Sequence, residues 1–299
     1  MGKTLSIIIP CYNAEKTISK CLQSIFQSAN KLSLDFTYEI IVINDGSSDQ
    51  TLSIINNVDG IKVINHNKNL GLSSARNTGI QESDSKYIVF IDSDIVLSEN
   101  WIHNMLTLII KHDDIMGITG NLEARPENKN KTLDGYLFGK YRGTKEISLD
   151  KPLNYKFFVF SNTIIKRSVL NAVGNFDNIL KNYGGEDTEL AIRIHKKYSQ
   201  GMRKLTTVNA YHITHKTLDK HLNDIFEYGK YNFHKIIQKH PTYKVDLGYN
   251  WIVSFWTNFL FNSLSVLICK MLLKKTNNPL LIKFLVINSF IKGARSLLL

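Results

Sequence analysis

Short, almost wholly apolar runs alternate with helix-patterned segments through the first hundred residues, and this alternation limits the fold more than any other feature of the chain. The runs are continuously apolar, as strands must be when helices cover both faces of a parallel sheet. Segments with apolar residues at helical spacing fill the intervals between them. We therefore predict an α/β fold around a mostly parallel central sheet. The predicted strands are residues 5–9, 38–43, 61–64 and 87–91, and the predicted helices are residues 13–27, 73–81 and 98–111.

The middle of the chain carries a weaker pattern. Between Arg125 and Tyr155 the periodicity fades into a polar, lysine-rich stretch, which predicts a long loop. After the second predicted strand, Ser48 or Asp49 is expected to cap the N-terminus of a further helix. The other elements predicted beyond the loop are strands at residues 157–165 and 206–211 and helices at residues 187–197 and 218–239.

The last fifty residues predict a pair of hydrophobic helices, at residues 251–273 and 280–299. The first is long enough to span a bilayer, for which about 20 apolar residues are needed. A spanning hairpin would place Lys274 and Lys275 on the outer side, against the positive-inside tendency. Four polar residues also recur at helical spacing, as in an amphipathic helix that lies on a surface: Ser254, Asn258, Asn262 and Ser265. We therefore expect in-plane or shallow membrane association, with packing on the rest of the chain or on a second subunit as the alternative.

Charge is unevenly distributed. Of the net charge of +11, residues 1–120 carry 9 Lys and Arg against 13 Asp and Glu, and the remainder carries 28 against 13. An acidic first part suits a metal-assisted site, and the basic remainder suits an anionic lipid surface or a phosphorylated ligand. Nucleic acid is disfavoured because no recognised binding motif or interleaved stacking aromatics accompany the basic residues.

Cysteine usage and the N-terminal segment bear on the cellular compartment. The three cysteines lie scattered in apolar segments without the spacing of a zinc site or a disulfide framework, so we predict reduced packing residues. The apolar run that precedes Pro10 is too short for a signal peptide, and a cytoplasmic protein is expected.

Carboxylates follow two of the predicted strands at the sheet edge where open α/β folds bind ligands. The strand at residues 87–91 leads directly into Asp92-Ser93-Asp94. Hard cations such as Mg²⁺ or Mn²⁺ prefer carboxylate oxygens, often one or two from protein with phosphates completing the shell. The turn Asn44-Asp45-Gly46-Ser47 follows the strand at residues 38–43, and Glu186-Asp187 follows two glycines before a helix. Taken alone, the first is equally an Asx turn, and the second is a helix cap or a general base.

Five motifs in a fixed order give these pieces a common interpretation. The chain resembles family 2 glycosyltransferases with the GT-A fold, of the inverting, non-processive bacterial type, over roughly residues 4–240. The motifs that carry the resemblance are Pro10-Cys11-Tyr12-Asn13, Asn44-Asp45-Gly46-Ser47, Asn69-Leu70-Gly71 with Ala75-Arg76-Asn77-Thr78-Gly79, Asp92-Ser93-Asp94, and Gly185-Glu186-Asp187. One departure is Asn44, where the family usually has an aspartate. The Gln-x-x-Arg-Trp signature of processive members is absent from the sequence.

The resemblance implies roles for individual residues. Asp187 would be the catalytic base, with Glu186 positioning the acceptor. Metal ligands would be Asp94, Asp92 and, late in the fold, His212, with Mn²⁺ or Mg²⁺ as the cofactor. The residues expected to bind the nucleotide sugar are Pro10, Tyr12, Asn13, Asp45, Gly71, Arg76, Asn77, Asp92 and Ser93. It also implies a catalytic domain over residues 1–240, with a nucleotide-sugar part at 1–120 and an acceptor part at 121–240, followed by the hydrophobic helical region at 241–299.

The expected function is inverting transfer of one hexosyl or N-acetylhexosaminyl group from a nucleoside diphosphate sugar, with UDP as the expected nucleotide. The expected acceptor is a hydroxyl of a saccharide or lipid-linked molecule in cell-envelope glycan biosynthesis. Peripheral attachment to the inner face of the cell membrane is expected, and a homodimer is compatible with the sequence. Two alternatives stay open: transfer to a polyprenyl phosphate, and a catalytically silent membrane-associated scaffold. A Rossmann oxidoreductase is disfavoured because Gly-x-Gly-x-x-Gly does not follow the first strand.

Overall fold

A computed structural model of the chain describes residues 3–125, 131–139, 149–213 and 216–297. The chain divides into two compact units. The first comprises residues 1–125, 147–179 and 186–214, and the second comprises residues 126–146, 180–185 and 215–299. The division expected at residue 240 stays a prediction.

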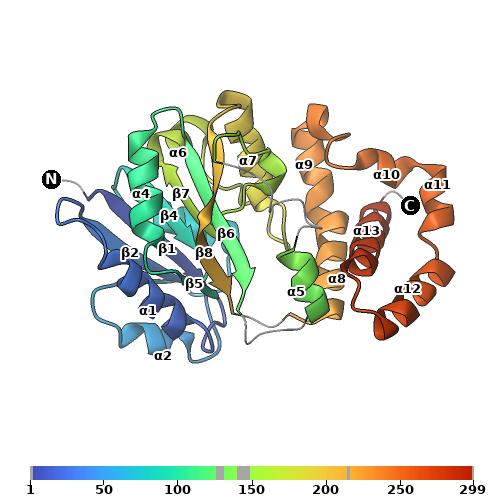
Figure 1. The fold of residues 1–299 in the computed structure, drawn as a ribbon, viewed down its shortest axis with the longest axis horizontal. Helices are drawn as coiled ribbons and strands as arrows, with labels where there is room; N and C mark the ends of the chain where they lie inside the picture. The colour runs from blue at the N-terminus through green and yellow to red at the C-terminus, as the bar shows by residue number, and fades with distance from the viewer. Residues whose placement is uncertain (1–2, 126–130, 140–148, 214–215, 298–299) are drawn as a thin grey trace. The chain divides into compact units, whose positions relative to one another are not determined.

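An eight-stranded mixed sheet forms the centre of the first unit (Figure 1). Its strands are β1 Leu5–Cys11, β2 Tyr38–Asn44, β3 Lys62–Asn65, β4 Tyr87–Ile91, β5 Ile95–Leu97, β6 Gly117–Ala124, β7 Asn162–Lys166 and β8 Met202–His212. They lie in the order β3-β2-β1-β4-β7-β6-β8-β5. β1 pairs in parallel with β2 and β4, β2 with β3, and β6 with β8, whereas β7 and β5 run antiparallel to their neighbours. The predicted α/β class is confirmed.

Helices cover both faces of this sheet, which explains why the first four strands are apolar on both sides. They are α1 Ile18–Ala29, α2 Thr51–Asn56, α3 Leu72–Gln81, α4 Trp101–Lys111, α6 Arg167–Val173 and α7 Glu186–Lys197. Leu5, Ile7 and Ile9 of β1 belong to the same buried cluster as residues of α1 and α4. Ile8 points the other way, towards α3, where a Cβ on Gly79 would lie 2.3 Å from its Cγ2. The absence of a side chain at Gly79 therefore brings α3 close to the strands.

The predicted helix at residues 13–27 was wrong at its start, because α1 begins at Ile18. Three of the five residues before it bind the segment that follows β2. Asn13 N donates to Ser47 Oγ, Ala14 N donates to Thr51 Oγ1 at 2.7 Å, and the next backbone N–H donates to Asp49. Asn13 also has φ 49°, a left-handed conformation that a right-handed helix cannot include. Asp49 also accepts from Thr51 N at 3.0 Å, immediately before α2, although the residue that occupies the N-cap position is Gln50 rather than Ser48 or Asp49.

The predicted strand at residues 157–165 was wrong over its first half. Residues Tyr155–Phe157 form a 3₁₀ turn, and β7 begins only at Asn162. Phe158 and Phe160 are buried without strand pairing, and the Phe160 ring meets Phe90 edge to face with centroids 5.7 Å apart. A short apolar run shows burial but does not distinguish a strand from a buried turn. β5, β6 and α6 were not predicted.

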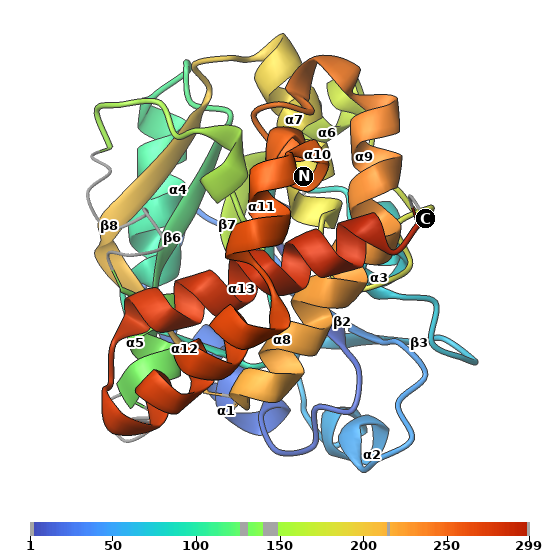
Figure 2. The same cartoon turned by 90° about the vertical axis from the view of Figure 1, so that its right-hand side faces the viewer.

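The second unit is helical, which confirms the predicted C-terminal helical region. Its α-helices are α5 Lys131–Leu137, α8 Leu218–Glu227, α9 Phe233–Lys239, α10 Tyr249–Val253, α11 Phe255–Leu260, α12 Ser263–Lys275 and α13 Pro279–Arg295. α13 packs against α5, α8, α10 and α12 (Figure 2). Leu222 of α8, Cys269 of α12 and Leu285 of α13 share one buried cluster. Of the loop expected at residues 125–155, residues 126–130 and 140–148 lie outside the described residues, and α5 forms between these two gaps.

Two long helices predicted for this unit are interrupted. The run at residues 218–239 contains a π-helical turn, Tyr228–Asn232, where Asn232 Nδ2 donates to the carbonyls of Asn182 and Gly184, both at 2.7 Å. The run at residues 251–273 is divided among α10, α11 and α12. Its polar residues end and begin these helices: Asn262 and Ser265 form a capping box at the start of α12. The prediction of one amphipathic helix with a polar stripe was therefore wrong. Within the described residues, no helix combines the length and apolarity that a membrane span requires.

Candidate active site

Asp45 directly follows β2 and binds the segment that leads into α3. Its Oδ1 accepts from Leu70 N at 2.9 Å and its Oδ2 accepts from Gly71 N at 2.9 Å. His66 Nδ1 lies 2.7 Å from Oδ1, and His66 Nε2 lies 3.0 Å from Thr78 Oγ1. The side chain of Asp45 is only 4% exposed. The carboxylate therefore links the ends of β2 and β3 to the N-terminus of α3.

The turn after Asp45 requires glycine. Gly46 has φ +69°, and a Cβ there would lie 2.4 Å from the carbonyl carbon of Lys68. Both the backbone conformation and the close approach of the two segments exclude a side chain. Asn13, with φ 49°, accepts from Ser48 N at 2.9 Å and supports the same turn. The predicted nucleotide-binding segments around Asn13 and Asp45 are thus brought together.

Replacing Asp45 with alanine is expected to lower the free energy of unfolding by about 1–3 kcal/mol, because three hydrogen-bond donors lose a charged acceptor in a buried place. Urea denaturation followed by circular dichroism measures the change. Asp59→Ala, which removes an exposed carboxylate, is the matched control and should change the free energy of unfolding by less than about 0.5 kcal/mol. Equal stability of the two variants would contradict a structural role for Asp45.

Arg76, on α3, joins two of the predicted catalytic carboxylates. Its Nη2 lies 2.9 Å from Asp92 Oδ1, and its Nη1 lies 2.8 Å from Asp187 Oδ1. The guanidinium is 1% exposed, and its Cζ lies 5.1 Å from the ring centroid of Phe176. Burial disfavours the charged form, but Asp187 and Asp92 outweigh it and raise the pKa of Arg76 above its usual value. Arg76 is therefore a permanent cation between β4 and α7.

Asp187 and Glu186 begin α7 and differ in their surroundings. Asp187 Oδ2 accepts from Phe160 N at 3.1 Å, so both of its oxygens have a donor when Arg76 is included. Burial, followed by the negative charge of Asp187, raises the pKa of Glu186 to about 7. Burial also raises the pKa of Asp92, with Arg76 opposing it. Asp187 is thus held by two hydrogen-bond donors, whereas Glu186, with a pKa of about 7, titrates near neutral pH.

Asp94 and His212 form a second pair near the first. Asp94 lies in the turn between β4 and β5, and His212 ends β8 opposite Ile95. His212 Nε2 is 3.2 Å from Asp94 Oδ2, and both side chains are 27% exposed. His212 is the histidine predicted to complete a metal shell, and the nearby His215 lies outside the described residues.

The donor set at this pair suits a divalent cation that arrives with a nucleotide. No group of three or more His, Cys, Asp and Glu side chains in the described part of the chain is arranged to hold a metal ion. Two protein donors, however, match the way Mg²⁺ and Mn²⁺ bind when substrate phosphates complete the shell. Asp92 already pairs with Arg76. The residues present therefore fit a metal held jointly by Asp94, His212 and a diphosphate.

The remaining predicted site residues differ in how available they are. Tyr12 is 51% exposed beside Asn13, and Ser93 is partly exposed between the two aspartates. Pro10 is buried in β1, and Gly71 contributes its amide to Asp45. The amide of Asn77 is engaged by the segment after α6, donating to Phe176 O at 2.8 Å and accepting from Phe176 N at 3.0 Å. A direct contact between Asn77 and a nucleotide sugar stays a prediction, as do the other individual roles.

Residues that the sequence did not single out complete this site. His66 follows β3 at the same sheet edge as Asp45, and its position directly after a predicted strand could have identified it as a site residue. Phe160 N binds Asp187 from a segment with no motif. The three cysteines are free and buried, and burial raises the pKa of Cys11 behind Ser93.

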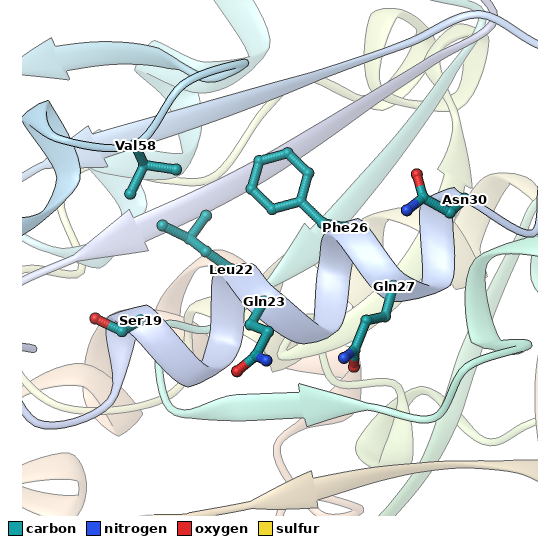
Figure 3. Close-up of a pocket in the computed structure, with 7 residues that line it drawn as sticks. All are labelled: Ser19, Leu22, Gln23, Phe26, Gln27, Asn30 and Val58. Atoms are coloured by element: carbon teal, nitrogen blue, oxygen red, sulfur yellow. The ribbon is translucent and has the colours of Figure 1, made fainter.

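A surface pocket along α1 is a separate feature. Figure 3 shows that its lining comes from one side of α1 and from Val58. The lining residues are Ser19, Leu22, Gln23, Phe26, Gln27, Asn30 and Val58. None of them has an ionisable side chain, so the pocket offers no acid, base or charged metal ligand.

The sheet, with its carboxylates at the strand ends, defines a nucleotide-diphospho-sugar transferase of the GT-A type. The chain belongs to glycosyl transferase family 2, whose sequence model matches residues 6–174, more than half of the chain. Arg76, Asp92 and Asp94 lie inside the matched stretch, and Asp187 and His212 lie beyond it.

Curated relatives match part of the chain. Poly-beta-1,6-N-acetyl-D-glucosamine synthase of Staphylococcus epidermidis is 32% identical over 183 residues, 58% of this chain and 42% of that protein. An uncharacterized glycosyltransferase of Haemophilus influenzae is 34% identical over 129 residues, 42% of this chain and 38% of that protein. The matched stretch thus spans less than half the length of either relative.

Solved structures match almost the whole chain. The mannosyltransferase PcManGT of Pyrobaculum calidifontis, in complex with GDP-Man and Mn²⁺, has a TM-score of 0.68 and 14% identity, covering 99% of this chain and 87% of that chain. Staphylococcus aureus TarS 1–349, in complex with UDP-GlcNAc, has a TM-score of 0.56 and 17% identity, covering 98% and 91%. At these identities the likeness shows the fold alone.

Proposed function

We propose that the protein transfers one sugar, with inversion, from a nucleoside diphosphate sugar to a hydroxyl of a saccharide or lipid-linked acceptor in envelope glycan synthesis. The observation that carries the proposal is the bridge from Asp92 through Arg76 to Asp187. It joins the strand end expected to hold the nucleotide sugar to the residue expected to act as base. The poly-N-acetylglucosamine synthase and the TarS complex with UDP-GlcNAc support a UDP-linked donor, whereas PcManGT is in complex with GDP-Man.

Donor binding is assigned to the ends of β1, β2 and β4. Tyr12 offers an exposed aromatic ring for stacking against a base, and Asp45 keeps the segment around Gly71 in place beside it. Asp94 and His212 would hold Mn²⁺ or Mg²⁺, which when bound neutralises charge on the diphosphate. A surplus of carboxylates near Arg76, namely Asp92, Asp94, Glu186 and Asp187, also favours a cation at this end of the sheet.

The transfer step is assigned to Asp187. The acceptor hydroxyl gives its proton to this carboxylate while its oxygen forms a bond to the anomeric carbon. The bond from the anomeric carbon to the diphosphate oxygen breaks, and the diphosphate leaves with the electron pair. Arg76 and Phe160 N hold Asp187 in one orientation, which is the contribution a positioned base requires. No protein nucleophile takes part, so the configuration inverts.

Calorimetric titration with UDP, in the presence and absence of Mn²⁺, tests the proposal. We expect Mn²⁺ alone to bind weakly, because the protein offers two donors, and UDP to bind at least tenfold more tightly when Mn²⁺ is present. Asp94→Ala should remove the metal-dependent part of UDP binding. Asp113→Ala, at an exposed carboxylate after α4, is the control. Absence of binding to UDP and to other nucleoside diphosphates would instead favour the catalytically silent scaffold.

A further inference from the structure

Large apolar side chains gather on the surface of α11 and α12 in the second unit. Each side chain in this group is 45% exposed or more. We call these residues the apolar face: Phe255, Trp256, Phe259, Leu260, Leu264, Leu267, Ile268, Met271 and Leu272. Soluble surfaces seldom expose so many large apolar side chains on two adjacent helices, so the group indicates an interaction surface.

α12 is apolar on two sides. Its inner side carries Val266, Cys269 and Leu273, which join buried clusters with α8 and α13. Its outer side carries the apolar-face residues of α12, spaced at i, i+3, i+4, i+7 and i+8: Leu264, Leu267, Ile268, Met271 and Leu272. One stripe already anchors the helix to its own unit. The outer stripe takes no part in that packing, and such an exposed apolar stripe indicates a further apolar partner.

The charge around the apolar face is of one sign. From Leu247 to Leu299 the sequence contains no Asp or Glu, and it contains six basic residues, Lys270, Lys274, Lys275, Lys283, Lys292 and Arg295. Lys270, Lys274 and Lys275 lie on α12 itself and are exposed. In Figure 1, α11 and α12 both lie to the right of α13. Apolar side chains flanked by cations, with aromatics among them, match an anionic lipid interface.

We propose that the apolar face docks on an anionic bilayer, with α11 and α12 lying in the plane of the interface. Phe and Trp enter the region between headgroups and acyl chains, and the lysines of α12 contact lipid phosphates. A second copy of the chain fits less well, because the same face of that copy contributes no Asp or Glu that could pair with these lysines. The proposal is independent of sugar transfer, since no residue of the candidate active site belongs to the face.

Co-sedimentation with vesicles tests the proposal on the full chain. Vesicles of phosphatidylcholine with phosphatidylglycerol should bind the protein, and vesicles of phosphatidylcholine alone should bind it at least tenfold more weakly. Changing Lys270, Lys274 and Lys275 to Gln should weaken binding by about fivefold for each lysine removed. Phe255→Ser with Trp256→Ser should weaken binding to both vesicle types by more than tenfold. Matched controls are Leu34→Ser at a fully exposed position and Lys16→Gln with Lys20→Gln on the first unit.

A second readout separates bilayer contact from loss of folding. Tryptophan emission should be quenched by lipids brominated on their acyl chains, and Trp256→Phe should reduce that quenching while leaving vesicle binding intact. Unchanged binding of the serine and glutamine variants would overturn the proposal. So would a failure to bind anionic vesicles, or light scattering that shows a dimer lost in the same serine variants. UDP binding by these variants, measured as above, reports separately on the proposed function.

Discussion

Exchange of Arg76 for methionine is expected to lower sugar transfer by about 10²–10⁴-fold and the free energy of unfolding by about 3–5 kcal/mol. The methionine leaves two carboxylates, Asp92 and Asp187, without the buried cation that each contacts within 3 Å. The stability loss follows from burying uncompensated charge. The loss of rate follows from freeing Asp187 to leave the orientation in which it accepts a proton. Urea unfolding and a transfer assay with a UDP sugar measure the two effects.

Two further variants make this result interpretable. Arg76→Lys retains the charge but cannot bridge two carboxylates with the same planar fork, so it should recover stability more fully than activity. Lys62→Met removes an ion pair to Glu82 in which the N–O distance is 2.7 Å, but at a site where both side chains are nearly half exposed. Its effect on the free energy of unfolding should be below about 1 kcal/mol. Wild-type transfer by Arg76→Met would show that the bridge is not needed for catalysis.

The Arg76 bridge also shows the limit of what the sequence could predict at the site. Asp92, Asp94 and Asp187 were singled out because each stands in a motif at a strand end or a helix start, and their roles were inferred from the family resemblance that the ordered motifs carry. The contact between Arg76 and Asp187 joins residues 111 positions apart. No periodicity in the sequence reports such a contact, because it depends on tertiary packing: α3 packs on β1 and β2, and α7 packs on α6 and on the 3₁₀ turn Tyr155–Phe157. The same holds for Phe160 N, whose role depends on the path of an irregular segment.

The strands also differ in whether their local sequence or their tertiary packing determines the pattern that identifies them. β1, β2 and β4 are mostly apolar because helices cover both faces of the sheet, and this pattern is visible in the sequence. β6 was missed because Gly117, Gly120 and Asn121 interrupt its apolar character. Gly120 is needed there because a Cβ would lie 2.6 Å from Trp101 Nε1. A residue selected for close packing across the core thus removed the signal that would have identified the strand.

In the helical unit the misassigned residues are those that end helices. Asn262 and Ser265 have helical spacing in the sequence, and that spacing is also the spacing of a capping box. One pattern therefore predicts either a polar stripe on one long helix or a break between two helices. The break lets α11 and α12 turn against α13, and it leaves the apolar face exposed on short helices. One amphipathic helix over the whole run would have a single apolar side, whereas α12 has an inner apolar side that is packed and an outer one that is exposed.

Asp187→Asn is expected to reduce kcat by about 10²–10⁴-fold while the protein stays folded and still binds UDP with Mn²⁺. The amide keeps the size of the side chain and can accept from Phe160 N, but it cannot take the acceptor proton. Single-turnover assays and calorimetry on the same preparation separate chemistry from donor binding. Transfer at the wild-type rate would exclude Asp187 as the base.

Glu186→Gln is the matched control at the neighbouring position. The dependence of its kcat on pH tests whether ionisation of Glu186 affects the reaction. In the wild type, ionisation of Glu186 with a pKa of about 7 places a second negative charge beside Asp187. That charge makes Asp187 a stronger proton acceptor, so kcat should rise as the pH increases through about 7. Glutamine removes the ionisation, and the variant should keep the low-pH rate across the same range. A large loss in Glu186→Gln with little loss in Asp187→Asn would exchange the roles of the two carboxylates, because the group that takes the proton must be the one whose removal stops the reaction.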